Sequence, residues 1–335
     1  TGHDNTAIGA FALNSISTAS RNVGVGNSAL EATTTGGENT AVGEQALKSL
    51  TTGTLNTALG RHALTKQTTA SNNTAIGAYA MRYNNNATGC VAVGLEALRG
   101  TSDNSPLSGN YNTAVGYGAL LANTTASDNT AVGYGALTTL TTGSDNTAVG
   151  KNALVAATTG YRNTCIGNSA GDSITTGFRN TCIGDISGET ITGGEDNTCL
   201  GYNAQTSAAS STHQFCLGDA NVSTLRCAVT SITSISDRRD KTDIVDLPLG
   251  IDFLNTLRPV KFKWQKRTPD KTNGKVRAGF IAQELQVAQS DCKYMDLVLE
   301  DNPDKLEATP GNLIPVLVNA IKELSAKVEE LESKL

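Results

Sequence analysis

The sequence predicts a mainly β protein: a parallel β-solenoid or β-roll built on 17-residue repeats, followed by a small α+β domain that ends in a coiled-coil helix. The motif Asn-Thr-Ala-Val-Gly, or a close variant, returns every 17 residues through two-thirds of the 335-residue chain. Residues 1–235 carry 10 Lys and Arg with 14 Asp and Glu, whereas the last hundred residues carry 16 and 17, together with six of the seven prolines. An apolar heptad then closes the sequence. This change in composition marks a domain boundary.

The glycine that closes each motif defines the repeat. We expect thirteen repeats over residues 1–222, a junction over 223–235 and a separate domain over 236–335, with its coiled coil at 312–335. Because the sequence opens at Thr1 inside a repeat, the true N-terminus is expected to lie upstream. A single five-residue insertion separates Gly94 from Gly116 in the series Gly9, Gly26, Gly43, Gly60, Gly77, Gly94, Gly116, Gly133, Gly150, Gly167, Gly184, Gly201 and Gly218.

Each repeat predicts one coil. A short β-branched segment, a glycine, an apolar pair and a Thr-Thr-Gly turn indicate two short strands per coil, because glycines weaken helices and the period is too short for a helix pair. At about 4.7–4.9 Å per coil, the stack would make a rod of roughly 60 Å. We expect a glycine corner, an interior filled by the Val or Ile before each glycine, and a stabilising asparagine ladder. The ladder would contain Asn5, Asn22, Asn39, Asn56, Asn73, Asn112, Asn129, Asn146, Asn163, Asn180 and Asn197.

Composition excludes several classes of function. Net charge is mildly negative in both regions, which argues against a nucleic-acid partner. No run of 18 apolar residues occurs, so we expect no membrane insertion. Cys165, Cys182, Cys199 and Cys216 take the alanine position of the motif, and their spacing does not fit a zinc site. We expect buried thiols that pack as small apolar groups, with a disulfide ladder or metal column as the alternative. The sequence therefore predicts no metal site and no cofactor.

Few side chains of the repeats could carry chemistry. The histidines, expected to be solvated or to pack, are His3, His62 and His213. Three tyrosines share the position after the glycine: Tyr117, Tyr134 and Tyr202. For these we expect surface or inter-chain packing, and a sugar-stacking platform is the alternative. No carboxylate pair of the kind used by glycosidases is present, so no such activity is assigned.

The Ala-Ile-Gly and Ala-Val-Gly corners resemble the head repeat of trimeric autotransporter adhesins, and similar repeats occur in viral and phage fibres. The resemblance implies a left-handed parallel β-roll assembled as a homotrimer. A trimer also suits the small apolar volume of each coil, because a single thin solenoid would bury too little surface to be stable.

The last hundred residues contain four motifs in order. Ser236-Asp-Arg-Arg-Asp-Lys241 opens the region, and Ile244, Gly250, Leu254 and Leu257 predict a helix. Alternating side-chain types in the segment 258–264 predict a strand, and the segment 278–285 predicts a strand followed directly by a helix. The closing heptad, with spacings of three and four, is Ile314, Leu317, Ile321, Leu324, Val328, Leu331 and Leu335.

Together these motifs resemble the C-terminal intramolecular chaperone of endosialidase tailspikes and related phage fibres, a self-cleaving serine–lysine peptidase family. The resemblance implies that Ser236 is the nucleophile, that Lys241 is its general base and that the Ile235–Ser236 bond is cut. Asp237 or Arg239 would orient this bond or polarise its carbonyl. A lysine accepts a proton only when neutral, so burial or nearby positive charge must favour the neutral amine. Without this role, Ser236 would be an ordinary helix N-cap.

The heptad leaves the oligomeric state open. β-Branched residues at a with Leu at d favour two strands in isolated parallel coils, whereas both resemblances imply three. A helix that packs on its own domain is a further alternative. The charged residues around the heptad favour an inter-chain coil.

We therefore expect a fragment of a trimeric viral or phage fibre or tailspike, used for host attachment or as a structural appendage. Residues 1–235 would be the mature part and 236–335 the released chaperone. The protein would join the virion after assembly in the host cytoplasm, with a host receptor or glycan as partner. The alternatives are a bacterial trimeric surface adhesin, which should end in a membrane anchor instead of a charged coil, and a fibre with a non-cleaving cap.

Overall fold

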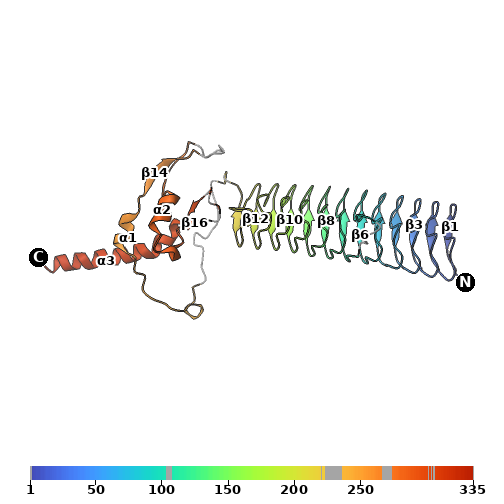
Figure 1. Ribbon diagram of the computed structural model, residues 1–335, viewed down its shortest axis with the longest axis horizontal. Helices are drawn as coiled ribbons and strands as arrows, with labels where there is room; N and C mark the ends of the chain where they lie inside the picture. The colour runs from blue at the N-terminus through green and yellow to red at the C-terminus, as the bar shows by residue number, and fades with distance from the viewer. Residues whose placement is uncertain are drawn as a thin grey trace. The chain divides into compact units, whose positions relative to one another are not determined.

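The chain forms two compact units, Thr1–Asp219 and Ala220–Leu335 (Figure 1). The computed structural model describes residues 2–102, 108–219, 221–222, 236–265, 274–300, 302, 304 and 306–334. The expected junction, 223–235, lies outside these residues. Among the helices of the described ranges, none has both the length and the apolarity needed to cross a bilayer.

The first unit is a stack of coils that build one parallel sheet, as the repeat predicts (Figure 1). In its described residues the sheet has thirteen strands in sequence order, and neighbours pair in register, as in Thr40↔Thr57. The β6–β7 pair absorbs the insertion, since Val91 pairs with Thr113. The strands are β1 (Thr6–Ile8), β2 (Val23–Val25), β3 (Thr40–Val42), β4 (Thr57–Leu59), β5 (Thr74–Ile76), β6 (Val91–Val93), β7 (Thr113–Val115), β8 (Thr130–Val132), β9 (Thr147–Val149), β10 (Thr164–Ile166), β11 (Thr181–Ile183), β12 (Thr198–Leu200) and β13 (Phe215–Leu217).

Each coil has one strand, so the expectation of two strands per coil was wrong. After the corner glycine the backbone enters the left-handed region at Gln45 (φ 57°) and Leu47 (φ 50°), which side-chain-bearing residues seldom adopt. The chain therefore curls where a second strand would extend, and Leu47 becomes fully buried. The corner requires glycine: Gly43 has φ +133°, and a Cβ there would lie 2.6 Å from the carbonyl oxygen of Gly60.

The interior of the coil is filled by alanine and leucine, and the expectation that the Val or Ile before each glycine fills it was wrong. The central strand residue Ala58 and the following pair, Ala63 and Leu64, are fully buried, whereas Leu59 is 47% exposed. Because side chains alternate along a strand, burying the central residue turns both neighbours outward. The outward positions form what we call the outer apolar column: Ile8, Val25, Val42, Leu59, Ile76, Val93, Val115, Val132, Val149, Ile166, Ile183, Leu200 and Leu217.

The asparagine ladder is confirmed, and its amides connect successive coils. Asn146 is fully buried, and its Oδ1 accepts hydrogen bonds from the backbone N and the Nδ2 of Asn163 at 3.0 and 3.1 Å. Its Nδ2 donates to Asn129 Oδ1 at 3.0 Å and to the carbonyl oxygen of Gly160 at 2.9 Å. Each rung thus supplies the partners that its neighbours would otherwise lack inside the stack.

Three of the four cysteines at the central strand position are buried free thiols, as predicted, and Cys216 is only partly buried. Cys165, Cys182 and Cys199 are fully buried and lie in register on successive strands. A glycine takes the leucine position on two of these coils, and a Cβ on Gly188 would lie 2.3 Å from Cys182 Sγ. The hydrogen bond with Cys182 and burial raise the pKa of Cys199 to about 12, which disfavours the reactive thiolate. These thiols fill volume and are not set up for chemistry.

The second unit combines short helices with two hairpins around its own core. The predicted helix begins at Ile251, and Ile244 is exposed. Leu285, Leu297 and Val316 lie in the core. The elements are η1 (Arg238–Asp240), α1 (Ile251–Thr256), β14 (Val260–Lys263) paired with β15 (Val276–Gly279), α2 (Ala282–Ala288), η2 (Lys293–Met295), β16 (Val298–Leu299) paired with β17 (Glu307–Ala308), η3 (Pro310–Leu313) and α3 (Ile314–Glu332).

Helix α3 has two apolar faces, and among the described residues of its own unit only one is covered. Val316 and Ala320 are buried against the unit, and Asn319 Nδ2 donates to the carbonyl oxygens of Leu247 and Leu249 at 2.9 and 3.2 Å. The heptad side chains from Ile314 to Leu331 are exposed, including Ile321 at 63%. The heptad is therefore not what fixes α3 to its own unit. Leu335, the last heptad residue, lies outside the described residues.

We expect Asn146→Ala to lower the free energy of unfolding by about 2–5 kcal/mol, because it leaves buried groups of Asn163 and Gly160 without partners. Chemical denaturation followed by circular dichroism measures the loss. Asn168→Ala is the matched control, since its amide bonds Asp185 at the exposed surface. Equal destabilisation by both variants would contradict the role of the ladder.

We expect Cys182 and Cys199 to resist alkylation by iodoacetamide at pH 8 until the protein is unfolded, because a thiolate must form and be reached. Peptide mass mapping of labelled native and denatured protein measures this. Cys216, which is only partly buried, is the internal comparison. Labelling of Cys182 in the native protein as fast as Cys216 would show that the thiol column is open.

Candidate functional site

The structure brings together Ser236 and Lys241, the two residues to which the resemblance assigns the roles of nucleophile and general base. The short helix η1 lies between them, and Lys241 Nζ donates a hydrogen bond to Ser236 Oγ at 2.5 Å. This is the contact through which a neutral lysine would withdraw the hydroxyl proton. Ile235, on the other side of the expected scissile bond, lies outside the described residues.

Asp237 and Arg239 form the cap of this turn. Asp237 Oδ1 accepts a hydrogen bond from the backbone N of Arg239 at 2.8 Å, and the carboxylate also pairs with the Arg239 guanidinium at 2.6 Å. The side-chain and backbone hydrogen bonds from Arg239 lower the pKa of Asp237. Asp237, and not Ser236, is thus the N-cap, so the Ser236 hydroxyl is left for Lys241. Neither Asp237 nor Arg239 has a hydrogen bond to Ser236 Oγ among the described residues.

The site is open to solvent in a single chain. The side chains of Ser236, Lys241 and Arg239 are exposed. An exposed ammonium is well solvated, and burial is what favours the neutral amine. The hydrogen bond through which a proton could be transferred is therefore present among the described residues of one chain.

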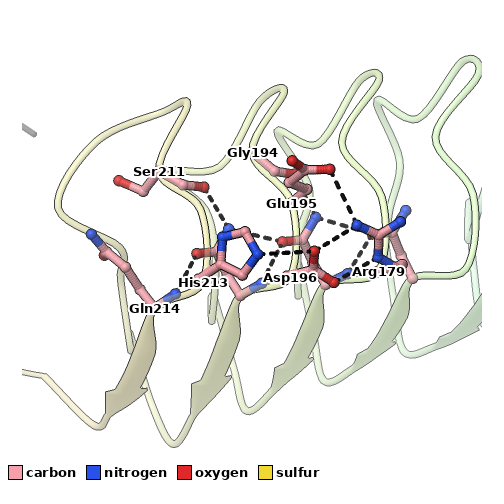
Figure 2. Close-up of polar contacts among 10 residues, drawn as sticks. Arg179, Gly194, Glu195, Asp196, Ser211, His213 and Gln214 are labelled. Carbon is pink, nitrogen blue, oxygen red and sulfur yellow. Dashed lines mark hydrogen bonds and ion pairs between the residues drawn. The ribbon is translucent and has the colours of Figure 1, made fainter. Parts of the chain in front are cut away.

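A second polar cluster, on the last coils of the first unit, was not anticipated (Figure 2). Arg179 Nη2 contacts Asp196 Oδ2 at 2.6 Å and Glu195 Oε2 at 3.3 Å, and His213 Nε2 lies 3.5 Å from the same Asp196 oxygen. The hydrogen bond from Arg179 lowers the pKa of Asp196. Arg179, Asp196 and His213 follow one another at intervals of 17 residues and so take the same position in successive repeats. Comparing the charged residues at that position across the aligned repeats would have found the cluster.

This cluster has a structural role. Beside it, Gln214 extends the asparagine ladder, since its backbone N donates to Asn197 Oδ1 at 3.0 Å (Figure 2). The carboxylates of the cluster face Arg179, which leaves them poorly suited to bind a cation. Within the described ranges, no group of three or more His, Cys, Asp or Glu side chains could hold a metal ion.

The aromatic residues of the repeats form stacks between coils. Tyr117 and Tyr134 stack with their ring centroids 5.4 Å apart, and both remain exposed, as does Tyr202. His62 stacks on Tyr79 at 5.4 Å and is a packing histidine, whereas His3 and His213 are exposed. These contacts leave both functions considered for the tyrosine column, packing and sugar stacking, as hypotheses.

Comparison with known proteins supports the chaperone-like C-terminal region. The family model described as "Chaperone of endosialidase" matches residues 236–293. The match begins at Ser236 and covers η1, α1, the β14–β15 hairpin and α2. No match to the chain was found among curated proteins or among solved structures.

Proposed function

We propose that the chain is part of a trimeric phage or viral fibre or tailspike, whose C-terminal domain drives assembly and then cleaves itself off at Ile235–Ser236. The observation that carries this proposal is the position of the Ser236–Lys241 contact at the first residues of the family match. The parallel solenoid that precedes it is the kind of structure that needs an assembly aid, because its interior is narrow and its outer column is apolar.

In the proposed reaction Lys241 takes the proton of the Ser236 hydroxyl, and Oγ attacks the carbonyl carbon of Ile235. The C–N bond between Ile235 and Ser236 breaks, and the departing amine takes up the proton from Lys241. The product is an ester between the Ile235 carboxyl group and the Ser236 hydroxyl. Water hydrolyses this ester, which leaves a carboxylate on Ile235 and a free hydroxyl and amine on Ser236.

The trimer is supported by two apolar surfaces that one chain leaves uncovered. The first is the outer apolar column, where burying each half-exposed side chain would contribute on the order of 1 kcal/mol. The second is the heptad face of α3, where an open hollow of about 350 Å³ is lined by Ile321, Leu324 and Val328. Repetition of both surfaces on identical chains favours a symmetric assembly.

Assembly would also control cleavage. In one chain the Ser236–Lys241 pair is exposed, so a chain that has not yet assembled retains its helper domain. We propose that neighbouring chains bury the turn and so favour the neutral lysine. Once the helper is released, unfolding no longer retraces the path of assembly, and the solenoid becomes kinetically stable.

The proposed location is the virion, reached after assembly in the host cytoplasm, and the proposed role of the solenoid is host attachment or a structural appendage. A bacterial surface adhesin remains the alternative for the repeats. The chaperone match at 236–293 favours the fibre.

We expect the purified parent chain to give two fragments that meet at Ile235–Ser236 by intact-mass spectrometry. Ser236→Ala should stay whole because the nucleophile is absent, and Lys241→Met should stay whole because the base is absent. Ser290→Ala, an exposed serine of the same unit, should cleave like the parent. An uncut parent would leave a fibre with a permanent cap, and cleavage of Ser236→Ala would remove Ser236 from the reaction.

We expect Ile321→Glu, made in the uncleaved Ser236→Ala background, to abolish or strongly weaken the trimer, because it places a charge in the heptad seam. Light scattering coupled to size-exclusion chromatography gives the mass of the assembly. Lys322→Glu is the control, since it changes the charge of α3 at an exposed b position, away from the a and d seam and the e and g positions that flank it. A monomeric Ser236→Ala parent, or a trimer that tolerates Ile321→Glu, would contradict the role of α3.

A further inference from the structure

All but one of the described arginines of the first unit contact a carboxylate. Six arginines lie in its described residues, 2–102 and 108–219, and five of them have such a contact. These pairs are Arg21–Glu38 at 2.8 Å, Arg61–Glu44 at 3.3 Å, Arg99–Glu96 at 2.7 Å, Arg162–Asp145 at 3.7 Å and Arg179–Asp196 at 2.6 Å. Arg82 is the exception, since no described carboxylate lies within ion-pair distance of it. Among the described residues, therefore, no ion pair compensates the charge of Arg82.

Arg82 is held in place by aromatic rings. Its guanidinium carbon lies 5.3 Å from the ring centroid of Tyr79 and 5.0 Å from that of Tyr83, both within the range of cation–π attraction. Its Nε is buried and has no hydrogen-bond partner among the described residues. The guanidinium is thus fixed by packing on two rings and not by hydrogen bonds or an ion pair.

The described residues around Arg82 contribute no net charge beside its guanidinium. His62 stacks on Tyr79, one of the two rings that contact Arg82. The pKa of His62 is lowered mainly by burial and then by the charges of Arg82 and Arg61. The imidazole is therefore neutral at neutral pH. The charge of Arg61, which also lies over Tyr79 at 5.5 Å, is balanced by Glu44. One fixed guanidinium remains with its hydrogen-bonding capacity unused.

A guanidinium fixed in this way is well placed to bind an oxyanion. Its planar fork of donors matches carboxylate, sulfate and phosphate groups in a bidentate manner. Because the rings already restrict its conformation, less entropy is lost when an anion binds. The phenol groups of Tyr79 and Tyr83 can donate to or accept from hydroxyl groups beside that anion.

We propose that Arg82, Tyr79 and Tyr83 form a binding site for the carboxylate or sulfate group of an acidic polysaccharide. A long polyanion such as a nucleic acid needs a stripe of uncompensated cations, whereas the repeats carry a net negative charge and five of their six described arginines are paired with carboxylates. A polysaccharide offers spaced anionic groups surrounded by hydroxyls, which fits a single guanidinium flanked by phenols. The inference rests on the proposed attachment role of the solenoid and gives it a ligand class.

The test is biolayer interferometry of the purified protein on immobilised polygalacturonate, dextran sulfate and neutral dextran. We expect binding to at least one acidic polymer and none to neutral dextran. Arg82→Ala should weaken that binding about tenfold or more, and Arg82→Lys should recover only part of it, because an ammonium lacks the planar fork. Arg162→Ala is the matched control, since Arg162 also lies over a tyrosine but has a carboxylate partner, and it should bind like the parent.

Three results would overturn the proposal: absence of binding to both acidic polymers, equal binding of Arg82→Ala and the parent, or equally tight, Arg82-dependent binding to single-stranded DNA. Tyr83→Leu is a second variant, which should weaken binding by releasing the guanidinium from one ring. Thermal unfolding of each variant establishes that the coil is intact. Intact mass and trimer mass are measured on the same samples, so a failure of the ligand inference is distinguishable from a failure of self-cleavage or assembly.

Discussion

The buried asparagine amides are the interaction on which the rest of the solenoid depends. Each coil curls through left-handed residues such as Gln45 and Leu47, a conformation that costs roughly 1–2 kcal/mol per residue for L-amino acids. A coil with so small an interior cannot offset that cost alone. The amide of Asn146 bonds the coils on both sides, so the conformation of one coil is fixed by its neighbours. Stability is therefore nearly a sum of interfaces between neighbouring coils.

The same geometry explains why this solenoid exposes apolar side chains. A three-residue strand can bury only its central residue, which is Ala or Cys here except for a glycine in β2, and Leu from the curled side fills the remaining space. The residues on either side of the centre must face outward whatever their polarity. Valine, isoleucine or leucine therefore recurs at one of these partly or fully exposed positions on coil after coil. The glycine corner reinforces this, because it keeps the stack too narrow to turn that column inward.

Much of the fold could be predicted because it is periodic. A 17-residue spacing places Asn129, Asn146 and Asn163 in one column without any knowledge of the coil, and the heptad identifies the uncovered face of α3 in the same way. The interior could not be predicted, because the choice between Ala and Val depends on which way the chain curls after the glycine. The Ser236–Lys241 contact followed from a recognisable motif. The contact of Arg82 with the rings of Tyr79 and Tyr83 did not, because it joins three different positions of the repeat, which only the curl of the coil brings together.

The two units place opposite demands on folding. In-register parallel pairing between coils is reached only after distant residues meet, which makes it slow and leaves strand edges open meanwhile. Helix α3 forms locally, and its heptad can bring chains together at low cost in loop closure. A domain that assists assembly is useful only while the register of the strands is being set. If it stays attached afterwards, the protein can unfold by the reverse of its assembly path. The Ser236–Lys241 pair has a hydrogen bond in place and is exposed among the described residues. Under the proposed function it would meet both demands, because burial of the pair on assembly would favour the neutral lysine.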